Sequence, residues 1–211
     1  MNIIEVKNVT KKFDDKIIVD SLTLNVKQGE TIGIVGRNGS GKTVLLKMIC
    51  GLYIPTSGNI TINSNKSNAE KLGVLIDSNF LSDETGFYNL KLLSQLGVKI
   101  KEDKIYELLK LVGLDPYNKT KYKNYSMGMK QKLKLANALM YDSEILILDE
   151  PFNGLDKDSV NHFRNIILQY KKQEKTILLT SHNYEDIKLL CDKIYEMDKG
   201  ILKEVDDYEE K

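Results

Sequence analysis

The segment GRNGSGKT, residues 36–43, constrains the fold of this chain more than any other part of the sequence. It fits the pattern G-x-x-x-x-G-K-[ST], whose glycines let the backbone curl so that several N–H groups point into one concavity. The apolar run 31–35 precedes it and a helix-like segment, 43–50, follows it, as the pattern requires. The segment therefore predicts a phosphate-binding loop between a buried strand and a helix.

Each residue type in this loop has a chemical use. A helix beginning near Lys42 adds the positive end of its dipole, and the Lys42 ammonium supplies a charge for the β and γ phosphates. The Thr43 hydroxyl can bind Mg²⁺. The residues expected to bind a nucleotide here are Gly36, Arg37, Asn38, Gly39, Ser40, Gly41, Lys42, Thr43 and Val44.

Strand-like and helix-like segments alternate along much of the chain. Apolar and β-branched runs predict strands at 3–6, 17–19, 22–26, 31–35, 58–62, 72–76, 144–149 and 175–180, and a final hairpin of 192–197 with 201–205. Apolar residues at helical spacing mark 43–50, much of 79–141, 160–170 and 184–191. Strands that alternate with helices favour an α/β core with a mainly parallel sheet.

Composition excludes several classes of protein. Lys and Arg number 31 against 30 Asp and Glu, so the net charge is +1 and bulk positive charge cannot drive nucleic-acid binding, although a local basic patch stays possible. The 41% hydrophobic content of 211 residues is enough for a core. The longest uncharged stretch, 48–65, contains Gly51, Pro55 and Gly58, so we expect no membrane span.

The ends of the chain and its two cysteines add little chemistry. The N-terminus lacks a basic segment followed by an apolar one, so we expect no signal peptide. Cys50 and Cys191 stand in apolar surroundings, which favours two reduced, buried thiols over a disulfide or a metal site.

Two further segments carry candidate chemistry. The predicted buried strand 144–149 would deliver Asp149 and Glu150 at its carboxyl end, where Asp149 could hold Mg²⁺ through water and Glu150 could orient or deprotonate an attacking water. Two solvated acids ending a strand are the alternative, which the phosphate loop disfavours. In YSMGMKQ, residues 125–131, Ser126 stands where a helix N-cap belongs and Gly128 allows close backbone approach. This start could bind an anion or be an ordinary capped helix.

Taken together, these segments resemble the nucleotide-binding subunit of ATP-binding cassette (ABC) transporters. GRNGSGKT resembles the family's phosphate loop, ILILDEP its magnesium strand, and YSMGMKQ its signature, in a form common in drug, peptide and lipid export subunits. Gly154-Leu155-Asp156 resembles the loop that crosses the dimer interface, and Thr180-Ser181-His182 resembles the switch-histidine loop. Phe13 stands where the family stacks an aromatic ring on adenine.

The resemblance implies a fold and its divisions. We expect an α/β P-loop NTPase core, a mainly parallel sheet flanked by helices, with an N-terminal antiparallel β-region and an inserted α-helical subdomain. Residues 1–76 and 142–211 would form the ATPase core, and 77–141 the helical subdomain with the signature. The chain ends about 50 residues past Ser159, so no appended regulatory domain is expected.

The resemblance also implies a mechanism with ATP and Mg²⁺. It assigns catalysis to Glu150, His182 and Lys42, with His182 as a γ-phosphate sensor, and the metal to Thr43, Asp77 and Asp149. Two copies, or one copy and a related subunit, would enclose ATP, with Ser126, Gly128 and Asp156 facing the partner. An integral-membrane permease on a separate chain would contact the region 79–96, which places the subunit in the cytoplasm on the inner membrane face. No nucleic acid is expected.

Some of these assignments have alternatives. Asp77 replaces the family's usual glutamine and could simply end a strand in solvent, Phe13 could belong to the core, and His182 could be structural. Met127 replaces the first glycine of the commonest signature, and His162 receives no role. The rival function is a soluble ABC-type ATPase acting on nucleic acid, the ribosome or cofactor assembly; a single cassette and the lack of sustained heptads argue against it.

Overall fold

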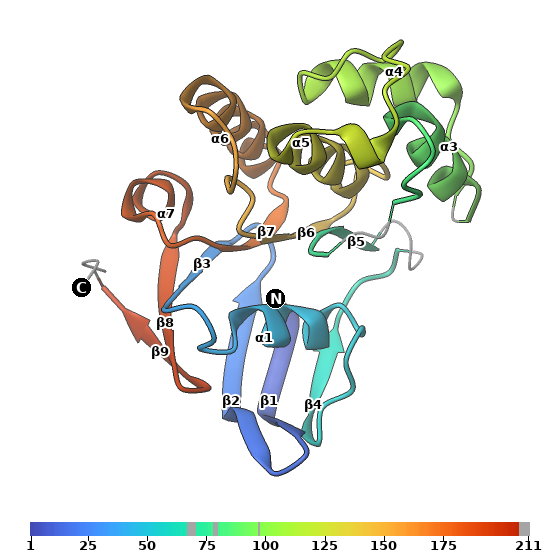
Figure 1. Cartoon of the computed structure of the whole chain (residues 1–211). Coiled ribbons are helices and arrows are strands. Elements are labelled where there is room, and N and C mark those ends of the chain that lie inside the picture. Colours follow the sequence, from blue (N-terminus) through green and yellow to red (C-terminus); the bar gives the residue numbers. More distant parts are fainter. Residues whose placement is uncertain (67–70, 78–79, 97, 207–211) are drawn as a thin grey trace.

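The computed structural model describes residues 1–66, 71–77, 80–96 and 98–206, which form two sheets and their covering helices (Figure 1). A three-stranded antiparallel sheet has the order β2-β1-β4, from Lys16–Lys27, Asn2–Phe13 and Ser57–Ile62. A six-stranded sheet has the order β5-β6-β7-β3-β8-β9. Its strands are β5 Leu72–Leu75, β6 Ile145–Asp149, β7 Thr176–Thr180, β3 Thr31–Val35, β8 Lys193–Asp198 and β9 Ile201–Val205.

The larger sheet is parallel except for β9, which pairs with β8 as an antiparallel hairpin. Its side chains alternate between faces: Ile145 and Ile147 of β6 join one apolar cluster, and Leu146 and Leu148 join the other. The predicted mainly parallel α/β core is confirmed. Because the carboxyl ends of parallel strands meet at one edge, the loops after β3, β6 and β7 lie together.

The antiparallel sheet has longer strands than the sequence pattern predicts. β1 and β2 each run for 12 residues, whereas alternation predicted only 3–6 in the first and two short pieces in the second. The register between them shifts at several points, and Asn8 and Ser21 have positive φ angles of 49° and 45°. Such bulges interrupt the two-residue period, which is why the pattern breaks while the strand continues.

Helix α1, Lys42–Ile49, lies between the two sheets and packs its apolar side chains against both (Figure 1). The opposite face of the large sheet is covered by α5 Met127–Ala138, α6 Lys157–Lys172 and α7 Tyr184–Leu190.

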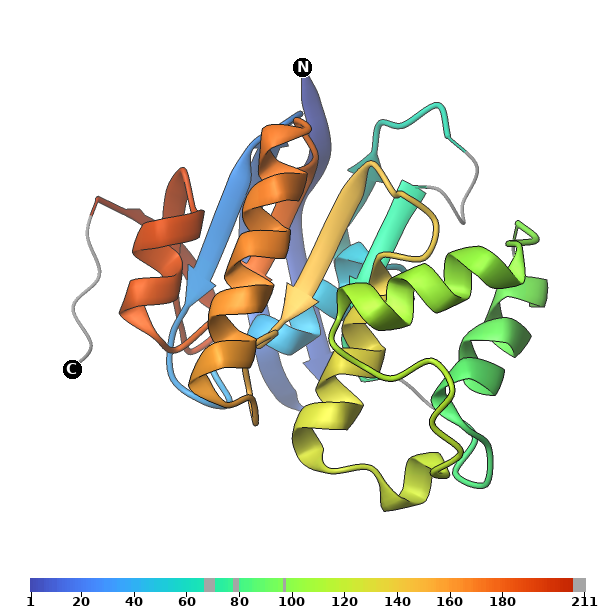
Figure 2. The same ribbon diagram turned by 90° about the horizontal axis from the view of Figure 1, so that it is seen from above.

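The segment 79–141, predicted to be helical, contains α3 Gly86–Leu96, α4 Glu102–Leu111, the 3-10 helix η1 Tyr122–Asn124 and α5. Figure 2 shows α3 and α4 extending to one side of the sheet. One apolar cluster nevertheless joins Leu90 and Ile105 of this region with Leu146 of the sheet. The division into 1–76, 77–141 and 142–211 stays a prediction. Within the described ranges, no helix is both long and apolar enough to cross a membrane.

Candidate functional site

The loop between β3 and α1 has the curled backbone that its glycines predicted. Gly36 has φ 140° and Gly41 has φ 114°, and a Cβ on Gly36 would lie 2.2 Å from the Met197 carbonyl oxygen. The buried Lys42 ammonium donates to the Gly36 carbonyl at 2.6 Å and to the Arg37 carbonyl at 3.2 Å. Only glycine fits the backbone at position 36.

The loop fits a phosphate ligand chemically. The Ser40 hydroxyl is buried and has no hydrogen-bond partner among the described residues. Helix α1 starts directly at Lys42, so its first N–H groups and the positive end of its dipole meet the loop. The Lys42 ammonium is held by backbone carbonyls that a phosphate oxygen could replace. Together they form a site for anionic oxygen atoms.

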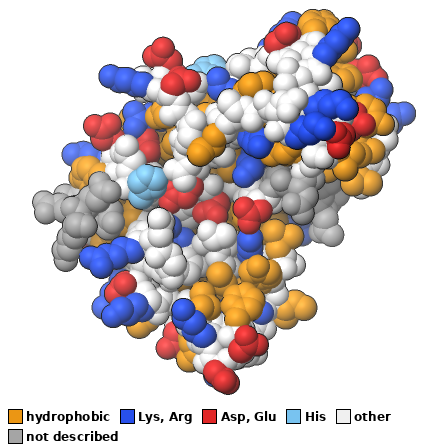
Figure 3. Space-filling model, viewed as in Figure 1, with side chains coloured by type: hydrophobic (Ala, Val, Ile, Leu, Met, Phe, Trp, Pro, Cys, Tyr) orange, Lys and Arg blue, Asp and Glu red, His pale blue; other side chains and the backbone are white. Residues whose placement is uncertain are grey.

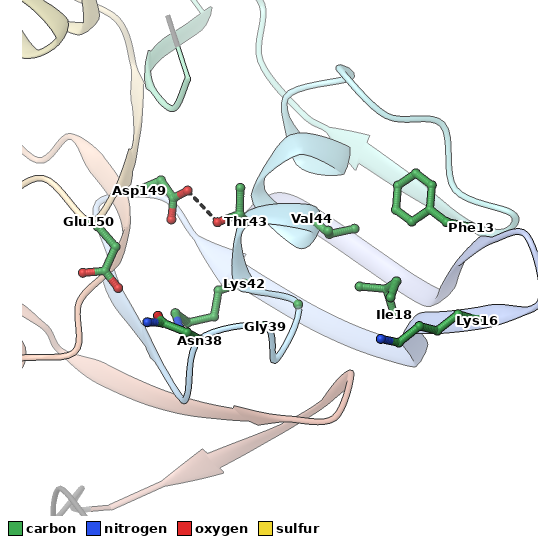
Figure 4. A pocket seen from close by; sticks show the side chains of 11 residues that line it. Phe13, Lys16, Ile18, Asn38, Gly39, Lys42, Thr43, Val44, Asp149 and Glu150 are labelled. Atoms are coloured by element: carbon green, nitrogen blue, oxygen red, sulfur yellow. Dashed lines mark hydrogen bonds between the residues drawn. The ribbon is translucent and has the colours of Figure 1, made fainter.

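Two hydroxyl groups hold the Asp149 carboxylate at the sheet edge. Thr43 Oγ1 donates to Asp149 Oδ2 at 2.7 Å (Figure 4), and Thr180 Oγ1 donates to Asp149 Oδ1 at 2.7 Å. The oxygen atoms of Thr43 and Asp149 are donors of the kind that Mg²⁺ prefers. No group of three or more His, Cys, Asp or Glu side chains suited to a metal occurs among the residues described. A Mg²⁺ ion here would therefore need further oxygen ligands from phosphate and water.

The backbone at Glu150 is left-handed, with φ 47°. Its N–H donates to Thr180 Oγ1 at 2.8 Å, and the Gln131 amide donates to the carbonyls of Glu150 and Pro151 at 3.0 and 2.9 Å. The Glu150 carboxylate lies 3.0 Å from His182 Nδ1. A non-glycine residue in this conformation is strained, and these bonds keep it there.

Asp149 and Glu150 lie together at the sheet edge, and the Glu150 carboxylate contacts His182. The space-filling view shows acidic side chains near the middle of one face of the molecule, with a histidine side chain close by (Figure 3). Beside them is a cavity of about 410 Å³, a common size for a small-molecule site. It is lined by Phe13, Lys16, Ile18, Asn38, Gly39, Gly41, Lys42, Thr43, Val44, Asp149 and Glu150 (Figure 4).

Phe13 lies at the end of this cavity away from the acids (Figure 4). Its side chain is 41% exposed, so it is not a core residue. Tyr53 packs edge-on against its ring at 5.5 Å between centroids, and Lys11 Nζ lies 4.9 Å from the ring centroid. The ring is therefore held in place while part of it stays available to a planar ligand.

Other predicted site residues lie outside the cavity lining. Asp77 is 78% exposed and pairs with Lys47 of α1 at 2.9 Å, and this hydrogen bond lowers the pKa of its carboxyl. Ser126 caps α5 by accepting the Met129 N–H at 3.2 Å, and it is exposed, as the capping pattern predicted. Gly128 is half-buried beside the Gly154 carbonyl. Asp156 caps α6 by accepting the Ser159 N–H at 2.8 Å.

Several residues of the site were missed by sequence reasoning. Thr180 binds the Asp149 carboxylate and the Glu150 N–H, and the Gln131 amide donates to the Glu150 carbonyl. Lys16 and Ile18 line the cavity. Thr180 could have been found, because it ends a buried strand directly before Ser181 and His182. The edge where parallel strands end collects functional side chains. The side chain of His162, which received no role, contacts the Leu111 carbonyl oxygen at 2.6 Å.

A phosphate loop after β3 and an acid pair after β6, on a mainly parallel sheet, define the chain as a P-loop ATPase. The model of the ABC transporter family matches residues 19–153. The uncharacterized ABC transporter ATP-binding protein YybJ of Bacillus subtilis is 39% identical over 206 residues, which is 95% of this chain and 94% of that protein. The bacitracin transport ATP-binding protein BcrA of Enterococcus faecalis is 35% identical over 210 residues, 96% of this chain and 68% of that protein.

The solved structure of the dimeric bacterial ABC transporter cassette MJ0796 shares the fold. Its TM-score is 0.86 at 23% identity, covering 97% of this chain and all of that one. The chain belongs to the ABC transporter family. It is an ATP-binding subunit of that family, which hydrolyses ATP with Mg²⁺ as cofactor.

Proposed function

We propose that this chain powers a separate membrane permease that exports a drug, a peptide or a lipid, and that it works at the cytoplasmic face of the cell membrane. The observation that carries the ATPase part is the cluster at the sheet edge, where Thr43, Asp149 and Glu150 lie beside the phosphate loop. The signature form YSMGMKQ and the name of the bacitracin transport relative support transport.

The residues take distinct roles in this proposal. The N–H groups of 36–43 bind the phosphates, and the Lys42 ammonium leaves its backbone carbonyls to contact them. Thr43 and Asp149 would hold Mg²⁺, which would neutralise charge on the triphosphate. Glu150 accepts the proton of the attacking water, and His182, 3.0 Å from its carboxylate, directs that carboxylate and senses the γ-phosphate.

The remaining site residues face a second copy of the chain or a related subunit. Ser126 is exposed at the start of α5, where its helix end can meet the phosphates of an ATP held by the partner. Asp156 lies in the loop proposed to cross the dimer interface. The permease would contact the region around α3, where Leu81 and Tyr88 expose 47% and 45% of their surface.

Replacing Glu150 tests the ATPase part of the proposal. Glu150→Gln keeps the size of the side chain but removes the base, so turnover should fall at least about 100-fold while ATP binding persists. The variant should also accumulate as an ATP-bound dimer on a sizing column. Glu144→Gln is the matched control, because Glu144 immediately precedes the amino end of the same strand. If Glu150→Gln hydrolysed ATP as fast as the parent protein, the role assigned to Glu150 would be refuted.

Co-expression tests the transport part. The chain should be recovered with membranes when its permease, sought among the products of neighbouring genes, is co-expressed, and it should leave the membrane fraction when that permease is omitted. Binding to membranes that resists high salt without any permease would contradict the proposal.

A further inference from the structure

The hydroxyl group of Thr180 connects Asp149, the last residue of the neighbouring strand β6, with Glu150, which follows it. Thr180 is the last residue of β7, its surface is 0% exposed, and it pairs with Asp149 across the parallel ladder. Its Oγ1 donates to Asp149 Oδ1 at 2.7 Å and accepts the Glu150 N–H at 2.8 Å. A hydroxyl has one proton and two lone pairs, so both bonds form at once.

The first bond orients the Asp149 carboxylate. Thr43 Oγ1 donates to Oδ2 of the same carboxylate at 2.7 Å, so one hydroxyl group from the start of helix α1 and one from the end of β7 hold its two oxygen atoms. Rotation of the carboxylate would break both bonds. The carboxylate is therefore preset toward Thr43, the second proposed Mg²⁺ ligand.

The second bond holds the backbone at Glu150. This residue has φ 47°, a left-handed conformation that is strained in a non-glycine residue. Without the Thr180 hydroxyl, the Glu150 N–H at the end of β6 would lose this buried hydrogen-bond acceptor. The direction in which the Glu150 side chain leaves the strand depends on this turn.

We propose that Thr180 is a positioning residue for ATP hydrolysis, whose single hydroxyl fixes both the metal-binding acid and the catalytic acid. The proposal rests on the roles proposed above for Asp149 and Glu150. Residues that hydrogen-bond metal-binding carboxylates typically contribute about 10- to 100-fold to activity or metal affinity. Thr180 itself touches neither the nucleotide nor the reacting atoms in this proposal.

The same strand supplies a matched control. Thr176, at the opposite end of β7, is also 0% exposed, and its Oγ1 accepts the Gly29 N–H at 3.0 Å. Thr176→Val and Thr180→Val each remove one buried hydroxyl that accepts a backbone N–H. They should reduce stability by similar amounts, whereas only Thr180→Val removes a bond to the acids.

The experiment compares the parent protein with Thr180→Val, Thr180→Ser, Thr176→Val and Glu150→Gln. For each, ATPase rate is titrated with Mg²⁺, KM for ATP is measured at saturating Mg²⁺, and affinity for a fluorescent ATP analogue is measured in EDTA. We expect Thr180→Val to lower kcat at least about tenfold and to raise the half-saturating Mg²⁺ concentration several-fold. Thr180→Ser keeps the hydroxyl group, so its kcat and its half-saturating Mg²⁺ concentration should stay close to those of the parent. Thr176→Val should match the parent, and EDTA affinities should agree, since the phosphate loop is intact.

Two outcomes overturn the inference. One is a Thr180→Val variant with the kcat and Mg²⁺ curve of Thr176→Val, and the other is a Thr180→Ser variant as impaired as Thr180→Val. If the valine variant fails to fold, Thr180→Cys replaces it with the same expectation, because a thiol is a weak donor and acceptor. Parent-like turnover by Glu150→Gln would instead refute the role proposed for Glu150, and the Mg²⁺ curves would still decide whether Thr180 orients Asp149.

Discussion

The two parts of the proposed ATP site are built differently. At the phosphate loop, Thr43, Asp149 and Thr180 are joined by hydrogen bonds of 2.7 Å, and Lys42 is buried. At the signature, Ser126 is exposed and its side chain bonds only to its own helix in the contacts described. The first part is complete within one chain. The second is a capped helix end, and in our proposal it gains a ligand only when a second subunit brings one.

The largest effect is expected from breaking the preassembled part at Gly36. Gly36→Ala would place a Cβ 2.2 Å from the Met197 carbonyl at φ 140°, so the loop cannot keep its shape. We expect ATP binding to be lost and the protein to lose more than about 2 kcal/mol of stability. Gly39→Ala is the control: its Cβ would have no described atom within 4 Å, and only its φ of 80° opposes it. Equal losses by calorimetry and ATP titration would refute the steric explanation.

Replacing Lys42 attacks the same part through charge. Lys42→Ala removes a buried ammonium that faces the phosphates in our proposal, and ATP affinity should fall at least about tenfold. Lys47→Ala, one turn further along α1, removes an ammonium that pairs with Asp77 instead and should cost much less affinity. Titration with a fluorescent nucleotide measures the affinity of the two variants. Equal losses of affinity would show that Lys42 has no special role.

Ser126 permits a test that separates capping from contact with a partner's ATP. Aspartate caps helices as well as serine does, so Ser126→Asp should keep the stability of the parent protein. Its negative charge would face the partner's phosphates, so the ATP-dependent dimer should weaken at least about tenfold. Ser126→Ala should instead lose about 1 kcal/mol of stability. Light scattering with Mg-ATP measures the dimer, with Ser126→Asp made in a protein that also carries Glu150→Gln. Normal dimerisation of this protein would contradict the assignment.

Asp77, which pairs with Lys47 of α1, should give a smaller effect. Its carboxylate pairs with Lys47, and near the triphosphate it would add a charge that Mg²⁺ must screen. We expect the ATPase rate of the parent to depend more strongly on Mg²⁺ than that of Asp77→Gln. The Mg²⁺ concentration that gives half of the maximal rate should be about two- to threefold higher for the parent. Superimposable curves for parent, Asp77→Gln and Asp77→Asn would remove Asp77 from the site.

The last prediction concerns Cys50, the residue that ends α1 behind the phosphate loop. Burial raises the pKa of its thiol from 9.0 to about 12. Because the folded state holds this proton more tightly, its contribution to stability is complete below about pH 9 and is lost as the pH rises toward 12. Between about pH 8 and about pH 10 the loss should be about 1 kcal/mol. Urea unfolding of the parent and of Cys50→Ala at these two pH values measures the loss. If the free energy of unfolding of the two proteins changed equally with pH, the prediction would be contradicted.

Sequence reasoning succeeded where structure is local. The phosphate loop, the strand ending at Asp149 and the cap at Ser126 are each contained in a few consecutive residues, so their patterns predicted them. The partners of these residues come from distant segments. Thr180 is 31 positions from Asp149, and Lys47 is 30 positions from Asp77. Which side chains face each other there depends on strand order and register, and a single sequence without an alignment does not contain those directly.

The Gln131 amide has a mechanical consequence. It ties α5 to the carbonyl oxygens of Glu150 and Pro151 at 3.0 and 2.9 Å, one turn from the exposed helix end at Ser126. A tilt of α5 must therefore either break both bonds or pull the backbone of Glu150 with it. The first turns of α5 therefore connect the exposed residue Ser126 with the strained turn at Glu150. Force applied to Ser126 from outside the chain would reach the acid without passing through the nucleotide.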